Sequence, residues 1–161
     1  MKNIVVLSDT HGRKANVKTL ETAFADADYI IHLGDGASDM KEIKQQYPDK
    51  TFICRGNCDF FSSSALPEGE LEVEGVKIFF CHGDKYRVKS TYEKIREEAK
   101  KRGATLALFG HTHRAEIVSD GGVTLVCPGS FHAPRNLGGT YAYISVSNGN
   151  AYPVIVGEQF L

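Results

Sequence analysis

Long apolar runs and an excess of charge of one sign are both missing from this 161-residue sequence. No stretch approaches the roughly 20 apolar residues that a transmembrane helix needs, and the run at residues 4–7 is too short for the core of a signal peptide. The formal net charge of −1 gives neither a broad basic face for nucleic acid nor a polybasic patch for a membrane surface. We therefore expect a cytoplasmic protein with no membrane partner and no extended nucleic acid as its ligand.

Paired cysteine motifs are missing as well. The four cysteines, Cys54, Cys58, Cys81 and Cys127, form no C-x-x-C pair and show no zinc-ribbon spacing. This pattern favours reduced thiols over a disulfide. The chain is 42% hydrophobic and 24% charged, which is typical of an ordinary globular protein, and its length predicts one domain over residues 1–161 with a single substantial core.

Strand and helix patterns alternate over the first 60 residues. Apolar runs at 3–7, 29–33 and 51–54 predict strands, and the segments 14–26 and 38–46 between them predict helices. This alternation is typical of an α/β sheet with parallel neighbours and right-handed crossovers. In such sheets, ligand-binding groups gather beyond the carboxyl ends of the strands.

Hairpin patterns appear beyond residue 60. Residues 71–80 predict one hairpin, and residues 141–156 predict another, because Asn148-Gly149-Asn150 is a strong turn signal. The other predicted elements are a charged helix over 90–102 that ends at Gly103, strands at 105–109, 116–118 and 123–126, and a turn at 119–122. We therefore predict an α/β fold of two mixed β-sheets packed face to face with flanking helices.

Polar side chains follow five of the predicted strands. The clearest case is Gly110-His111-Thr112-His113, because two histidines at i and i+2 leave an extended strand on the same side and the glycine allows close approach of the backbone. The full set of candidate metal ligands is Asp9, His11, Asp35, Asn57, His82, His111 and His113.

This set is too large for one tetrahedral zinc ion. It suits two adjacent divalent ions that accept nitrogen and oxygen ligands, such as manganese, iron, nickel, zinc or cobalt. One carboxylate must then bridge the two ions, and Asp35 is the candidate because it is central in the order of the motifs. Two ions about 3.5–4 Å apart deprotonate water and clamp the oxygens of an in-line displacement, which fits hydrolysis at phosphorus.

Each motif alone has a simpler interpretation. Asp9 could cap the following helix, Gly34-Asp35-Gly36 could be only a turn, and His82 could be structural. His32, inside a predicted strand, is interpreted as a core histidine or as support for a ligand. The set as a whole is harder to explain without a metal, because five separate strand ends would then carry metal-binding side chains by accident.

Five short motifs in this order resemble the signature of the calcineurin-like metallophosphoesterases. They are Asp9-x-His11, Gly34-Asp35, Gly56-Asn57, His82-Gly83 and Gly110-His111-Thr112-His113, and the later runs 128–130 and 134–135 are similar to the small, single-domain YfcE-like phosphodiesterase branch. The resemblance implies an αββα sandwich with a dinuclear centre at the sheet edge. It implies one metal held by Asp9, His11, Asp35 and His113, and a second held by Asp35, Asn57, His82 and His111.

The function that the resemblance implies is metal-dependent phosphoester hydrolysis, above all of phosphodiesters, by attack of a metal-bridging hydroxide. Manganese is the expected metal and a small phosphodiester the expected substrate. Asn57 and His82 are candidate catalytic residues as well as ligands, together with Cys58 and Arg135. Arg55 and Arg135 are candidate phosphate contacts, with exposure to solvent as the alternative for both, and His132 is not assigned to a metal.

Cys58 departs from the wider family pattern. Many members have a histidine at this position, where it can protonate the leaving group. A thiol is a poor general acid for an alkoxide, so we expect a preference for good leaving groups, with activated phosphodiesters above alkyl monoesters. Simple packing is the alternative role for this side chain.

Two other functions stay open at this point. A non-catalytic protein-binding scaffold of the same fold is disfavoured, because relatives used in that way tend to lose metal-site residues and none is missing here. A nuclease acting on polymeric nucleic acid is disfavoured by the near-neutral charge. Edge strands and the pair Phe60-Phe61 leave a homodimer open.

Overall fold

Two five-stranded sheets form the centre of the protein, which a computed structural model describes over residues 1–60 and 64–157. The first sheet has the order β10-β9-β1-β2-β3, in which β1, β2 and β3 run parallel and β9 runs antiparallel to both β1 and β10. Its strands are β1 (Lys2–Leu7), β2 (Tyr29–His32), β3 (Thr51–Ile53), β9 (Tyr141–Ser147) and β10 (Asn150–Val156).

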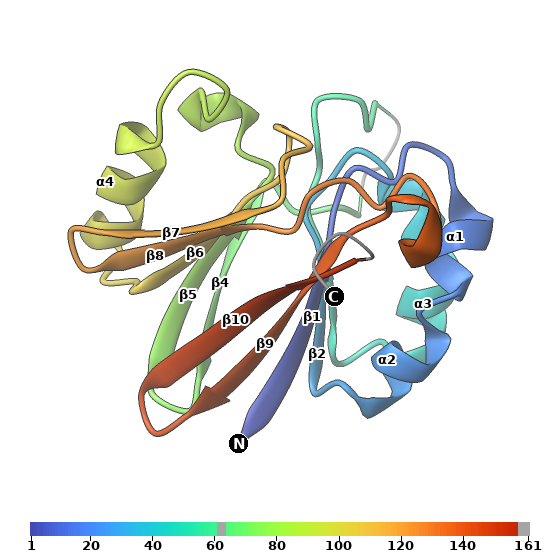
Figure 1. Ribbon diagram of the computed structural model, residues 1–161, viewed down its shortest axis with the longest axis horizontal. Coiled ribbons are helices and arrows are strands. Elements are labelled where there is room, and N and C mark those ends of the chain that lie inside the picture. The colour runs from blue at the N-terminus through green and yellow to red at the C-terminus, as the bar shows by residue number, and fades with distance from the viewer. Residues whose placement is uncertain (61–63, 158–161) are drawn as a thin grey trace.

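The second sheet has the order β4-β5-β6-β8-β7. Its three inner strands run parallel, and an antiparallel strand lies at each edge. Its strands are β4 (Glu68–Val73), β5 (Val76–Cys81), β6 (Leu106–Leu108), β8 (Val123–Cys127) and β7 (Glu116–Asp120). Two mixed sheets with helices outside them confirm the predicted fold class (Figure 1).

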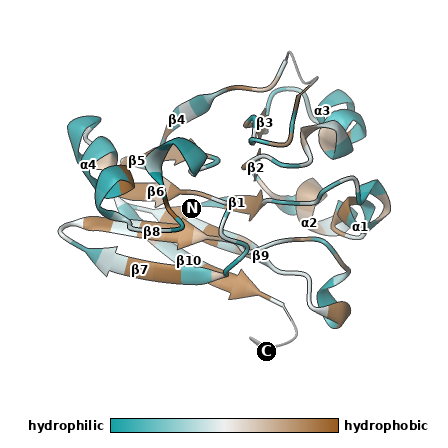
Figure 2. Ribbon diagram, turned by 90° about the horizontal axis from the view of Figure 1, so that it is seen from above, coloured by the Kyte–Doolittle hydropathy of each residue, from teal (hydrophilic) through white to brown (hydrophobic). Residues whose placement is uncertain are grey.

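β1 is buried on both faces, which explains its nearly continuous apolar sequence. Ile4 and Val6 belong to the core between the two sheets, and Val5 and Leu7 belong to a second core beneath three helices, α1 (Lys14–Lys18), α2 (Glu21–Asp26) and α3 (Lys41–Gln46). A third core lies between the other sheet and the helix α4 (Glu93–Lys101). The helices flank the apolar strands on opposite sides (Figure 2).

The prediction of a single helix over 14–26 is wrong, because the structure divides this segment into α1 and α2. Thr19 Oγ1 donates to Asn16 O at 2.6 Å, and the N–H of Leu20 donates to Val17 O, three residues back instead of four. This tightening ends α1 at Lys18, two residues short of the start of α2 at Glu21. The apolar face survives the break, since Val17 and Leu20 both lie in the core.

The later helices are shorter than predicted. Residues 37–40 form the 3₁₀ helix η1 (Ala37–Met40) before α3, and α4 begins at Glu93 instead of residue 90. Gly103 caps α4 with a φ of 72°, as predicted, and its N–H donates to Lys100 O at 3.0 Å. Two further 3₁₀ helices, η2 (Asp84–Tyr86) and η3 (Arg135–Leu137), are too short for an apolar period to indicate them. None of the helices in the described ranges could span a bilayer.

Both predicted hairpins are confirmed, with turns of two residues. Glu74-Gly75 has φ values of 49° and 81°, and Asn148-Gly149 has values of 51° and 78°, as the tight turns of β-hairpins require. The predicted turn over 119–122 is too long, because β7 continues to Asp120 and only Gly121-Gly122 reverses the chain. Phe60 is exposed, and Phe61 lies outside the described residues.

Candidate metal centre

Loops at one edge of the two sheets bring all the predicted ligands together. The loops follow the parallel strands β1, β2 and β3 of the first sheet and β5 and β6 of the second. Asp9 N–H donates to Gly34 O at 2.9 Å, which joins neighbouring loops of the first sheet. His111 N–H donates to Asp9 Oδ2 at 3.0 Å, which joins the two sheets.

Asp9, His11 and His113 form a first cluster. The Asp9 carboxylate is fully buried, and its Oδ2 accepts from Ser8 Oγ at 2.6 Å and from His111 N–H. Its Oδ1 has no hydrogen-bond partner in the described part of the chain, although His113 Nε2 lies 3.2 Å away and His11 Nε2 lies 3.7 Å away. The two imidazole nitrogens are 3.3 Å apart. A buried carboxylate oxygen without a donor, beside two ring nitrogens, fits a cation.

Asp35, Asn57, His82 and His111 form a second cluster. His82 Nδ1 lies 2.7 Å from Leu33 O, so the ring donates from Nδ1 and presents a lone pair at Nε2 when it is neutral. Asn57 Oδ1, His111 Nδ1 and Asp35 Oδ2 surround Nε2 at 2.9, 3.1 and 3.4 Å. These are the nitrogen and oxygen donors that divalent transition metals prefer.

Asp35 and His11 connect the two clusters. Potential ligand atoms lie within 4.8 Å of one another in three groups, which are Asp9–His11–His113, His11–Asp35–Cys58 and Asp35–His82–His111. Asp35 therefore reaches toward both clusters, which is the geometry that a bridging carboxylate needs. The Cys58 N–H donates to Asp35 Oδ1 at 2.8 Å and orients the carboxylate between them.

The backbone of the site is strained. Positive φ values, which residues other than glycine rarely adopt, occur at Asp9 (55°), His11 (46°), Asp35 (56°), His111 (71°) and His113 (59°). Glycines allow the loops to touch: a Cβ on Gly34 would lie 2.6 Å from Gly56 N, and a Cβ on Gly110 would lie 2.1 Å from Ser8 Oγ. Strain of this kind concentrates at functional sites, where the surrounding structure holds it.

Asp59 orients two of the ligand loops, a role that the sequence did not reveal. Its Oδ2 accepts from the N–H groups of Asp35 and Gly56, both at 2.7 Å. Its Oδ1 accepts from the N–H groups of Gly36 and Ala37 at 2.9 and 3.0 Å. An acidic side chain two residues after Gly56-Asn57 is the only signal that the sequence offers. The four hydrogen bonds fix the loops after β2 and β3 to each other.

His32 supports the site and is not placed as a ligand, as its position inside β2 predicted. Its Nδ1 accepts from Gly34 N–H at 3.1 Å, so the proton of the neutral ring lies on Nε2, 3.0 Å from Thr10 Oγ1. Thr10 Oγ1 in turn donates to Asp39 Oδ2 at 2.6 Å. Burial lowers the pKa of His32 to about 4, which keeps this buried ring neutral. Thr10 and Asp39 were not predicted.

The charges of the second cluster reflect a competition between burial and hydrogen bonding. Burial opposes ionisation of Asp35, but hydrogen bonds from His82 and Cys58 outweigh it and hold the pKa of this carboxyl below its usual range. Burial also opposes protonation of His82, yet Asp35 and the charge of Asp9 raise the pKa of this imidazole. The acceptors around His82 Nε2 thus attract positive charge, as a proton or as a metal ion.

The other predicted residues lie around the site or away from it. Cys58 is exposed at its rim, where partial desolvation and the charge of Asp35 raise the pKa of the thiol. Arg55 is exposed after β3, and Arg135 begins η3 and lines a separate cavity next to α2. His132 is exposed, and its carbonyl accepts from the side chain of Asn16. The roles of the two arginines in phosphate binding stay predictions.

Comparisons with known proteins identify the family of this chain. A model of the calcineurin-like phosphoesterase superfamily domain matches residues 1–149. The chain is 29% identical over 150 residues to a probable metallophosphoesterase, YsnB, of Bacillus subtilis, with 91% of this chain and 85% of that protein covered.

Solved structures share the fold at lower identity. A predicted phosphoesterase of Streptococcus pneumoniae superposes with a TM-score of 0.79 at 22% identity, covering 99% of this chain and 91% of that one. Vacuolar protein sorting 29 of Cryptosporidium parvum superposes with a TM-score of 0.75 at 13% identity, covering 96% of each chain. These two likenesses show the fold alone, whereas the matched residues 1–149 show the family. The chain belongs to the calcineurin-like phosphoesterase superfamily.

Proposed function

We propose that this chain is a dinuclear metal-dependent phosphodiesterase that acts on small phosphodiesters. The observation that carries the proposal is the convergence of three linked ligand groups on one sheet edge, with Asp35 common to two of them. The buried Asp9 Oδ1, which has no donor in the described ranges, supports the presence of a cation. Superfamily membership supports the phosphoester as the bond that is cleaved.

The proposed ligands divide between two positions. Asp9, His11, Asp35 and His113 would hold one ion, and Asp35, Asn57, His82 and His111 would hold the other. Two divalent ions, with manganese as the proposed metal, supply water activation and charge neutralisation for displacement at phosphorus. The hydrogen bond between His82 Nδ1 and Leu33 O fixes the ring so that Nε2 faces the cluster.

Cys58 determines which phosphoesters we expect the protein to prefer. Its thiol is exposed at the rim of the site and lies beside the proposed bridging carboxylate of Asp35. The same thiol is a weak proton donor for a departing alkoxide. Activated diesters, whose leaving groups need no proton, are therefore the preferred substrates.

The test is hydrolysis of bis(4-nitrophenyl) phosphate by metal-stripped protein, with and without Mn²⁺. Activity should return with the metal and fall at least about 100-fold in Asp35→Asn, since this variant removes the charge of the bridging group. Asp49→Asn, an exposed carboxylate outside the site, is the matched control and should keep wild-type activity. A well-folded protein that stays inactive with every divalent metal would refute the proposal and favour a protein-binding scaffold.

A further inference from the structure

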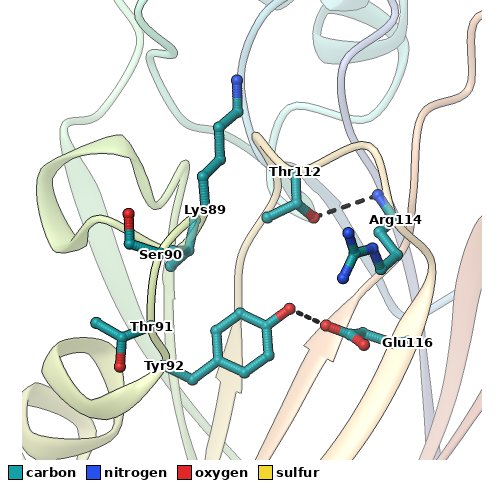
Figure 3. A pocket seen from close by; sticks show the side chains of 8 residues that line it. Lys89, Ser90, Thr91, Tyr92, Thr112, Arg114 and Glu116 are labelled. Carbon is teal, nitrogen blue, oxygen red and sulfur yellow. Dashed lines mark hydrogen bonds between the residues drawn. The ribbon is translucent and has the colours of Figure 1, made fainter.

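A cavity of about 540 Å³ opens beside the candidate metal centre and shares none of its proposed ligands. One wall comes from residues 88–92, which precede α4, and the other comes from Thr112, Arg114 and Glu116, which follow β6 (Figure 3). Thr112 stands between two candidate ligands in the sequence. Thr112 therefore joins the cavity wall to the loop that carries His111 and His113.

Two cations, Lys89 and Arg114, line the cavity from opposite walls. Both are exposed, and neither forms an ion pair within residues 1–60 and 64–157, whereas Lys14, Lys18 and Arg102 are each paired with a carboxylate. Unpaired surface cations are common, but these two line a concave surface next to a site for a negatively charged ester. Their positive charge is available to a ligand.

At the other end of the cavity, packing and a hydrogen bond hold Tyr92 in place beside the negatively charged Glu116. Tyr92 packs against Phe109 with ring centroids 5.1 Å apart, and its hydroxyl donates to Glu116 (Figure 3). This end disfavours an anion, so a negatively charged group is directed toward the two cations. The hydroxyl groups of Ser90, Thr91 and Thr112 also line the cavity and add neutral hydrogen-bonding groups.

We propose that this cavity binds a second phosphate group, so that the preferred phosphodiester carries a phosphomonoester on one of its ester arms. Arg114 can donate to two oxygens of that phosphate, and Lys89 adds a compact positive charge. Together they supply positive charge at one end of the cavity, while Glu116, held by Tyr92, keeps an anion away from the other end. The proposal names the substrate class of the same site and so rests on the proposed function.

The kinetic test compares two substrates that differ only in the distant phosphate. These are thymidine 5′-(4-nitrophenyl phosphate) and the same compound with a 3′-phosphate. The wild type should show a kcat/KM at least about tenfold higher for the 3′-phosphorylated substrate, and the double variant Lys89→Ala, Arg114→Ala should lose this preference. Lys94→Ala, which removes an exposed charge on α4 outside the cavity, should keep it. Equal kcat/KM values in the wild type, or an equal loss on both substrates in the double variant, would overturn the proposal.

A binding measurement separates this proposal from the proposed function. Calorimetry compares the affinity of the full chain for thymidine 3′,5′-bisphosphate and for thymidine 5′-monophosphate. The bisphosphate should bind at least about tenfold more tightly, and Arg114→Ala should remove the difference. Equal affinities would overturn the second phosphate site even in an active phosphodiesterase. A chain that prefers the bisphosphate but hydrolyses neither ester would support the anion site and contradict the proposed function.

Discussion

Replacing Asp9 with asparagine should stabilise the metal-free protein and at the same time remove most of its stabilisation by metal. Asp9 Oδ2 already accepts two hydrogen bonds, from Ser8 Oγ and His111 N–H, and the amide oxygen of asparagine can accept both. The amide nitrogen then replaces Oδ1, the buried atom that lacks a donor among the described residues. His113 Nε2, 3.2 Å from that position, becomes an acceptor for the new N–H.

The size of the effect follows from the same atoms. A buried polar group without a partner costs about 1–3 kcal/mol, so we expect Asp9→Asn to raise the free energy of unfolding of the metal-free protein by about 1 kcal/mol. This corresponds to a rise in Tm of about 2–4 °C for a chain of this length. In the wild type, Mn²⁺ at 100 times its Kd adds about 2.7 kcal/mol, and the variant should lose most of this gain because it loses one of the two proposed anionic ligands.

The assay is thermal unfolding of both proteins at pH 8, above the usual titration range of imidazole, with and without Mn²⁺. Asp49→Asn removes one exposed carboxylate and should match the wild type in both conditions. A metal-free Asp9→Asn protein that is less stable than the wild type would show that the buried Oδ1 does not destabilise the metal-free wild type. An undiminished gain from Mn²⁺ in the variant would show that Asp9 is not a ligand.

Three further expectations follow from the structure. Asp59→Asn should lower the free energy of unfolding by about 2–4 kcal/mol in urea titration and weaken Mn²⁺ binding. The variant replaces one carboxylate oxygen by an amide nitrogen, so the two N–H groups that donate to this oxygen lose their hydrogen bonds. An effect no larger than that of Asp49→Asn would contradict this role. Folding lowers the pKa of His32 from 6.5 to about 4, so the unfolded chain binds a proton in this range that the folded protein does not. The free energy of unfolding should therefore decrease by up to about 3 kcal/mol as the pH is lowered from 6.5 to about 4. His32→Gln should flatten this part of the stability profile, and equal slopes in the two proteins would refute the assignment. Cys58→His should raise monoester turnover relative to diester turnover, and an unchanged ratio would disprove our account of specificity.

The convergence of the proposed ligands could be predicted from the sequence, because each one follows a strand whose apolar pattern is visible. Asp9, Asp35 and His111 are placed by the ends of β1, β2 and β6, and parallel strands meet at one sheet edge whatever the details of the loops. Both hairpins could be predicted because their turns require positive φ, which glycine and asparagine adopt more readily than most residues. Local pattern and chain topology were sufficient for these features.

Residues that act through loop conformation could not be predicted. Asp59 and Asp39 accept hydrogen bonds from backbone groups in other loops, so their roles depend on turns that no period indicates. The break between α1 and α2 depends on one hydrogen bond of Thr19, which competes with an otherwise regular apolar face. Arg135 was assigned to phosphate binding on the basis of a motif alone, whereas in the structure it lines a separate cavity next to α2.

The distribution of backbone strain bears on the choice between an enzyme and a scaffold. Eight described residues other than glycine have positive φ, and five of them are proposed metal ligands. Glu74 and Asn148 lie in hairpin turns that require this conformation, and Arg87 follows η2 just before the cavity wall. A protein-binding surface needs no such strain at a sheet edge, whereas ligands that must converge on a metal do. The five strained ligands therefore favour a metal-dependent enzyme over a scaffold.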